Sequence, residues 1–264
     1  MFPVRDNIPT ASFPVVTTTL LVANVLAYFF FQHGTLSLGD PSSQAYLANL
    51  IDYGAIPYEL THPGDNCEFV NNFQDIACEG QRGVAGRADP QPATWITPFT
   101  AMFMHGGLLH LAGNMLFLWI FGNNVEDAMG PVRFIGFYVL AGLMALALQV
   151  VVSPQAAVPT IGASGAIAGV LGGYLVLFPR ARIITVVFII FFFTILELPA
   201  MFFLVIWFAQ QALFGYFDLV QPAEGGGVAY FAHIGGFVLG LALIKLFASE
   251  SRRRRQIERV GRMA

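Results

Sequence analysis

The feature that most constrains this chain is a series of long apolar stretches separated by shorter polar segments. The stretches cover residues 15–32, 106–122, 132–152, 162–178, 183–217 and 228–248. Each is close to or above the roughly 17–25 apolar residues that carry a helix across a bilayer. Only 11% of the residues are charged, against about 25% in soluble domains, so the chain cannot cover a water-facing surface. The sequence therefore predicts an all-α, polytopic membrane bundle.

The stretch 183–217 is too long for one simple span and marginal for two, and Glu197 and Pro199 interrupt it. Either 183–196 is partly inserted in the membrane before one span at 199–215, or both halves cross. Basic residues favour the first alternative, because Lys and Arg are enriched on the cytoplasmic side of membrane proteins. With six spans and a cytoplasmic N-terminus, 11 of the 13 Lys and Arg residues lie on that side. We therefore predict six transmembrane helices with both termini in the cytoplasm.

The pattern predicts four regions along the chain. Residues 1–32 form an N-terminal tail and a first span that is retained as an anchor, 33–94 an extracytoplasmic loop, 95–248 the core of spans 2–6, and 249–264 a basic tail. Cys67 and Cys78 both lie in the loop, where an oxidising compartment favours a disulfide. The alternative is a metal site with His62, which lacks a fourth ligand at a recognisable spacing. We predict the disulfide and no metal.

Polar side chains recur at one depth in three of the predicted spans. Ser164 begins the fourth span, His233 lies near the start of the sixth, and His105, His110 and Asn114 lie at or near the start of the second. All three spans run inward from the outer face, so these groups share one outer layer. Taken alone, each of these residues is compatible with an ordinary packing or interfacial role. Their common depth favours a functional site, because polar groups are costly in a membrane.

Glycines give a geometric reason for close helix contact. Gly165, Gly169 and Gly173 recur every four residues after Ser164, and Gly236 and Gly240 follow His233 in the same way. Small residues at this spacing let helix backbones approach closely in membranes. A serine–histidine hydrogen bond between two helices needs such an approach, since the two heavy atoms must lie about 2.6–3.2 Å apart.

At these residues the chain resembles the rhomboid intramembrane proteases. Three motifs carry the resemblance, in this order: His105-Gly-Gly-Leu-Leu-His110-Leu-Ala-Gly-Asn114, Gly162-Ala-Ser164-Gly165 and Ala232-His233-Ile-Gly-Gly236. The resemblance implies that Ser164 is the nucleophile and His233 the general base. It also implies that His110 and Asn114 stabilise an oxyanion, and that His105 and Gly162 shape the site together with Gly165 and Gly236. Ala168 departs from the family, because many relatives carry there an aromatic residue that packs against the histidine.

Spans 2, 4 and 6 contain no Asp or Glu, so the sequence favours a Ser–His dyad over a triad. We expect a serine endopeptidase that cleaves transmembrane segments near the outer leaflet, without cofactor, metal or nucleic acid, in a prokaryotic plasma membrane. Its partners are then transmembrane substrates and the lipid bilayer, and the oligomeric state stays open. The glycine-rich segment 221–227 is expected to form a flexible cap. The rival functions are an inactive rhomboid-like protein that escorts clients and, less favoured, a transporter.

Overall fold

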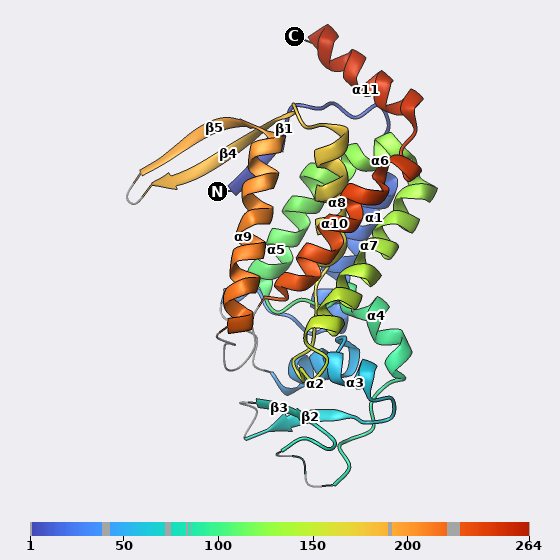
Figure 1. Cartoon of the computed structure of the whole chain (residues 1–264), viewed down its shortest axis with the longest axis vertical. Helices are drawn as coiled ribbons and strands as arrows, with labels where there is room; N and C mark the ends of the chain where they lie inside the picture. Colours follow the sequence, from blue (N-terminus) through green and yellow to red (C-terminus); the bar gives the residue numbers. More distant parts are fainter. Residues whose placement is uncertain are drawn as a thin grey trace.

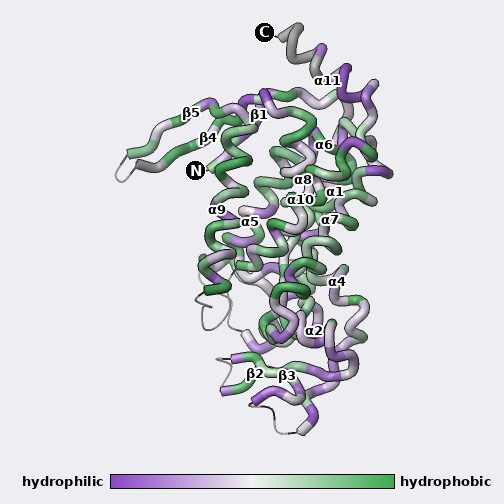
Figure 2. The backbone as a smooth tube through the Cα atoms, viewed as in Figure 1, coloured by the Kyte–Doolittle hydropathy of each residue, from purple (hydrophilic) through white to green (hydrophobic). Residues whose placement is uncertain are grey.

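The computed structural model describes residues 2–38, 43–71, 75–82, 84, 86–189, 192–220 and 228–263 of the 264-residue chain. It is a helical bundle with the N-terminal strand and the C-terminal helix at one end and a small subdomain at the other (Figure 1). Colouring by hydropathy shows the apolar residues concentrated in the bundle and the polar residues toward its two ends (Figure 2). The segment 221–227, predicted as a cap, lies outside the described residues.

Apolar helices occupy all six predicted spans. Four are long and apolar enough to cross a membrane: Leu108–Met129, which combines α5, η4 and α6, then α7 (Pro131–Val152), α9 (Ala200–Val220) and α10 (Tyr230–Phe247). Two are shorter, namely Val15–Phe31, formed by α1 and η1, and α8 (Ser164–Leu177). The prediction of a polytopic helical bundle is therefore confirmed. The second span runs further than expected, to Met129, because its helix continues through the polar residues after Gly122.

Helix α8 lies inside the bundle, and 11 of its 14 residues are buried. Its sequence is apolar around the whole circumference, as expected for a helix surrounded by others. Helices α7 and α10 pack closely against it, where its small residues meet Ala141, Ala145 and the backbone of α10. The first residue of α8 is Ser164, so the packing that buries this helix also fixes the position of the serine.

The described residues of the segment 33–94 form a subdomain at the end of the bundle opposite both termini (Figure 1). It contains α2 (Gln44–Tyr53), α3 (Pro57–Thr61) and a hairpin of β2 (Cys67–Val70) with β3 (Asp75–Cys78). Cys67 and Cys78 face each other across this hairpin and are joined by a disulfide. Because the bond uses both sulfurs, neither cysteine is free to bind a metal together with His62 in this structure. Short turns η2 (Thr94–Ile96), α4 (Thr97–Thr100) and η3 (Ala101–Phe103) lead into α5.

The segment after α8 differs from the helical prediction. Strands β4 (Arg182–Ile189) and β5 (Phe192–Pro199) form an antiparallel hairpin, and β1 (Phe2–Asp6) pairs with β4. The alternative in which both halves of 183–217 cross as helices is therefore wrong. Branched and aromatic residues dominate both strands, and such residues favour extended backbone as strongly as they favour a membrane helix. Glu197 lies on β5, exposed and paired with Arg182, rather than inside a span.

Carboxylates tie the N-terminal segment to the bundle. Glu126 accepts hydrogen bonds from the backbone N–H groups of Val16 and Thr17 at 2.9 and 2.7 Å, at the start of α1, where a helix leaves such donors without partners. Asp6 accepts from the Tyr174 hydroxyl on α8 and from Asn124 at 2.7 Å. Burial raises the pKa of the Asp6 carboxyl to about 6. The terminal helix α11 (Glu250–Met263) follows α10 and lies at the end of the bundle that also holds β1 (Figure 1).

Candidate active site

Ser164 and His233 meet inside the bundle although they lie 69 residues apart in the sequence. Ser164 is the first residue of α8, and His233 lies one turn into α10. The serine Oγ is 2.8 Å from the histidine Nε2, within the distance that proton transfer between a nucleophile and its base requires. The histidine is only 9% exposed, so protein atoms and not bulk water decide how its ring is oriented.

The second ring nitrogen of His233 is held by a residue that the sequence analysis missed. Gln211 on α9 places its Oε1 2.8 Å from Nδ1, and both side chains are buried. The indole of Trp207, one helical turn earlier, lies 5.9 Å from the imidazole between ring centroids. Ala168, at the position where many relatives carry an aromatic residue, is fully buried and has no ring to pack against the histidine. Helix α9 thus supplies the packing and the hydrogen bond that orient the ring.

Glycines bring the backbones of α8 and α10 into direct contact. A Cβ added to Gly236 would lie 2.0 Å from the carbonyl oxygen of Gly165, and one added to Gly240 would lie 2.0 Å from that of Gly169. A methyl group cannot be accommodated at these distances without moving one helix. A Cβ on Gly165 would in turn lie 2.7 Å from Ala145 on α7. The short serine and histidine side chains reach each other because these glycines remove the bulk between their helices.

His110 and Asn114 face the turn that precedes Ser164. Gly162 has φ +111°, and a Cβ there would lie 2.8 Å from His110 Nε2 and 3.5 Å from Asn114 Nδ2. The backbone N–H of Gly106 donates to His110 Nδ1 at 3.2 Å. Because Nδ1 accepts, a neutral imidazole carries its hydrogen on Nε2. Both α5 side chains therefore direct N–H donors toward this turn, and the buried Asn114 Nδ2 has no hydrogen-bond partner within the described structure.

His105 lies behind His110 and not at the serine. Its backbone N–H donates to Gln32 Oε1 at 2.9 Å, and its carbonyl accepts from Gln32 Nε2 and Tyr46 Oη, each at 2.6 Å. Its ring meets that of His110 edge to face, with 5.2 Å between centroids. These contacts join the first span, the subdomain of residues 33–94 and the start of α5, and they support the ring of His110.

A small cavity of about 30 Å³ borders Ser164 on the side of α7. Its walls come from the turn at Thr160–Gly162, from Ala101 and Met102, and from Ala229 and Ala232 at the start of α10. This volume accommodates about one or two water molecules. The arrangement therefore combines a partly buried hydroxyl, an oriented imidazole, two convergent N–H donors and a space for water beside the hydroxyl.

The fold and this site define a multi-pass α-helical membrane protein with a serine–histidine pair inside its bundle. A family model described as Rhomboid domain matches residues 92–250, which is more than half of the chain. The chain belongs to the rhomboid family. This agrees with the resemblance carried by the three motifs, all of which lie inside the matched region.

Individual relatives come from different kinds of organism. The yeast "Rhomboid protein 1, mitochondrial" of Saccharomyces cerevisiae is 32% identical over 167 residues, covering 61% of this chain and 44% of the relative. The human "Presenilin-associated rhomboid-like protein, mitochondrial" is 33% identical over 159 residues, which cover 50% of this chain and 42% of the relative. The "Rhomboid protease GluP" of Bacillus subtilis is 42% identical over 81 residues, which cover 31% of this chain and 15% of the relative. The chain thus spans less than half the length of each of these relatives.

Proposed function

We propose that this rhomboid is an intramembrane serine endopeptidase that cleaves transmembrane segments of other proteins. One observation carries the proposal: the Ser164 hydroxyl lies 2.8 Å from Nε2 of His233, whose Nδ1 lies 2.8 Å from Gln211. A neutral imidazole has one N–H and one acceptor nitrogen. Since the amide oxygen of Gln211 takes the hydrogen on Nδ1, Nε2 is left to accept the serine proton.

The reaction begins when Ser164 Oγ attacks a peptide carbonyl carbon and its proton passes to His233 Nε2. Collapse of the tetrahedral intermediate breaks the C–N bond, and His233 returns the proton to the leaving amine. Water then attacks the acyl-enzyme and gives a proton to His233; collapse of the second intermediate breaks the ester bond, and His233 returns the proton to Ser164 Oγ. The cavity beside Ser164 is suited to hold this water. Gln211 acts as a positioning residue, because it contacts His233 and not the reacting atoms.

The negative charge that develops on the substrate oxygen needs donors that are already in place. We assign this role to His110 Nε2–H and Asn114 Nδ2–H, together with the backbone N–H of Ser164. Support comes from the unpaired, buried state of Asn114 Nδ2 and from the position of both groups at the Gly162 turn. The N-terminus of α8 adds orphan N–H groups and a favourable helix dipole.

The expected topology places this site near the outer face of the membrane. The disulfide-bonded hairpin lies at the end of the bundle opposite both termini (Figure 1), and an oxidising compartment at that end favours the bond. We therefore propose cytoplasmic termini and cleavage in the outer leaflet. A prokaryotic plasma membrane stays a prediction, since relatives named as mitochondrial and a relative from Bacillus both match.

The test is cleavage of a single-span model substrate by purified protein in liposomes, with a fluorophosphonate reagent to label the reactive serine. Wild type should cleave and become labelled, whereas Ser164→Ala and His233→Ala should do neither. Ser153→Ala is the matched control, because Ser153 lies directly after α7 and its hydrogen bonds within the described structure run to Gln149 and Ala156, not to His233. Ser164-independent cleavage, or no cleavage and no labelling by wild type, would overturn the proposal. The second result is expected of an inactive, client-binding rhomboid.

A further inference from the structure

The β4–β5 hairpin carries a large apolar surface that the bundle does not cover. It projects sideways past α9 at the end that holds both termini (Figure 1). The chain from Ile183 to Leu196 contains no charged residue, and the hairpin is mostly apolar in Figure 2. Phe192 is 78% exposed and Ile195 62% exposed. An exposed apolar surface of this kind marks an interaction site.

Apolar residues are exposed on both faces of β5, the outer strand of the hairpin. Ile195 and Leu196 are neighbours on β5, and both are exposed. Side chains of successive residues in a strand point to opposite faces. A protein partner covering one face would leave the other face in water, where alternating polar residues are expected. Apolar side chains on both faces therefore fit an apolar medium that surrounds the strands.

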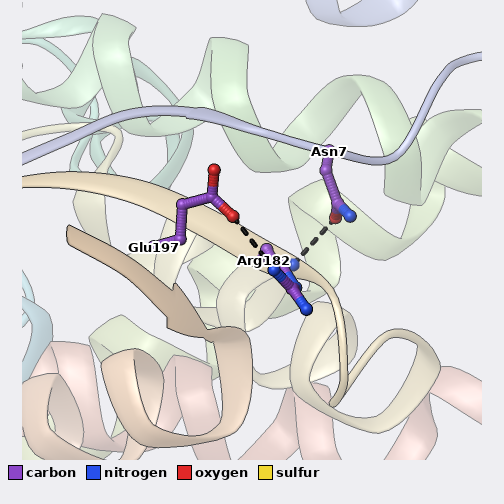
Figure 3. A network of polar contacts seen from close by, with 3 residues as sticks. All are labelled: Asn7, Arg182 and Glu197. Carbon is purple, nitrogen blue, oxygen red and sulfur yellow. Dashed lines mark hydrogen bonds and ion pairs between the residues drawn. The ribbon is translucent and has the colours of Figure 1, made fainter. Parts of the chain in front are cut away.

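The root of the hairpin is polar and firmly attached to the bundle. Arg182 pairs with Glu197 at 3.2 Å across the two strands, and its backbone N–H donates to Asn7 Oδ1 at 2.8 Å (Figure 3). Ile183, the next residue, is fully buried in the main core. Charges thus occur where the hairpin leaves the bundle and are absent beyond that point, as expected where a segment passes from headgroups toward acyl chains.

Helix α9 carries further exposed apolar residues beyond the polar root. It begins at Ala200, directly after Pro199, and its first turns expose Met201, Phe202, Val205 and Ile206. This part of α9 faces lipid in a multi-pass membrane protein. Arg5 and Arg180 are exposed near the root and complement anionic headgroups.

From these features we infer that the β4–β5 hairpin lies in the cytoplasmic leaflet, at the boundary between headgroups and acyl chains, as a lateral membrane anchor beside α9. Backbone hydrogen bonding sets its depth. The described sheet has the order β1-β4-β5, so β5 keeps one edge without a neighbouring strand. Open sheet edges are excluded from the hydrocarbon region, whereas headgroups and water can bond this edge at the boundary.

The test is site-directed fluorescence in liposomes of zwitterionic and anionic lipids. The described cysteines form a disulfide, so a thiol-reactive NBD probe labels a single added cysteine under non-reducing conditions. The variants are Phe192→Cys near the tip, Glu197→Cys at the root of the same strand, and Glu250→Cys on α11 as the aqueous control. Quenching is measured with lipids carrying a nitroxide near the headgroup or near the acyl end, and with aqueous iodide.

We expect the shallow nitroxide to quench the probe at position 192 several-fold more than iodide does. At position 250, iodide should quench several-fold more than the shallow nitroxide. At position 197, the ratio of the two should lie between these values. Iodide quenching at 192 equal to that at 250 would place the hairpin in water and overturn the inference. Stronger quenching by the deep nitroxide would overturn the boundary position. Crosslinking between two Phe192→Cys chains that persists on dilution with lipid would assign the surface to a second copy instead. None of these outcomes depends on whether the protein is a protease.

Discussion

Replacing Gln211 by leucine tests how His233, the proposed general base, is oriented. The substitution keeps the approximate size of the side chain and removes the acceptor that lies 2.8 Å from His233 Nδ1. Gln211 is 8% and His233 9% exposed, so water cannot readily replace the lost oxygen. Without that acceptor the ring is free to rotate, and the imidazole hydrogen can move to Nε2, where it blocks proton transfer from Ser164.

The expected size of the effect follows from the cost of leaving a buried donor unsatisfied. That cost is about 1–3 kcal/mol, which corresponds to about a 5- to 150-fold decrease in kcat. KM should change little, because Gln211 contacts the base and not the substrate. Gln211→Glu keeps an acceptor oxygen and should retain more activity than Gln211→Leu.

The assay is steady-state cleavage of the single-span substrate in liposomes, with the rate of serine labelling and the apparent melting temperature of each variant. Gln210→Leu is the matched control, because Gln210 is the preceding residue on α9 and its side chain is exposed. It should leave kcat and the melting temperature unchanged. The reasoning is refuted if Gln211→Leu keeps the wild-type kcat. It is also refuted if the Leu and Glu variants lose activity and thermal stability together, as a purely structural role predicts.

Three further predictions concern the oxyanion donors, the helix contact and the N-terminal strand. Asn114→Ala should lower kcat about 10²- to 10³-fold without lowering the melting temperature, since Nδ2 has no partner in the resting structure; wild-type kcat would contradict the assigned role. Gly236→Ala should lower both activity and thermal stability, because the new Cβ would lie 2.0 Å from the Gly165 carbonyl oxygen. The expected loss of stability is about 1–3 kcal/mol, and an unchanged melting temperature in detergent would contradict this. Burial raises the pKa of Asp6 to about 6, above about 3.9 in the unfolded chain, so its contribution to stability should fall as pH rises from about 4 to 6. Asp6→Asn should therefore raise the melting temperature more at pH ~7 than at pH ~4, and an equal change at both would count against the shift.

The sequence by itself determined the membrane bundle and the candidate residues. Length and apolarity of the stretches locate the helices, because a helix that crosses lipid must satisfy its own backbone over a fixed thickness. The positions of Ser164 and His233 within their spans predicted a common depth, since depth follows from residue count along a helix. Helix location and residue depth both follow from the order of residues along the chain, so the sequence alone predicts them.

Only the tertiary structure decided what surrounds the imidazole. Gln210 and Gln211 are adjacent and chemically identical, and the rotation of α9 about its axis determines which of them faces His233. That rotation results from packing against α8 and α10, so no local pattern reveals it. The hairpin was hidden for a related reason: Ile183–Leu196 is rich in branched and aromatic residues that suit both a lipid-facing helix and a strand. Pairing of β4 with the distant N-terminal strand β1 made the extended conformation the favourable one.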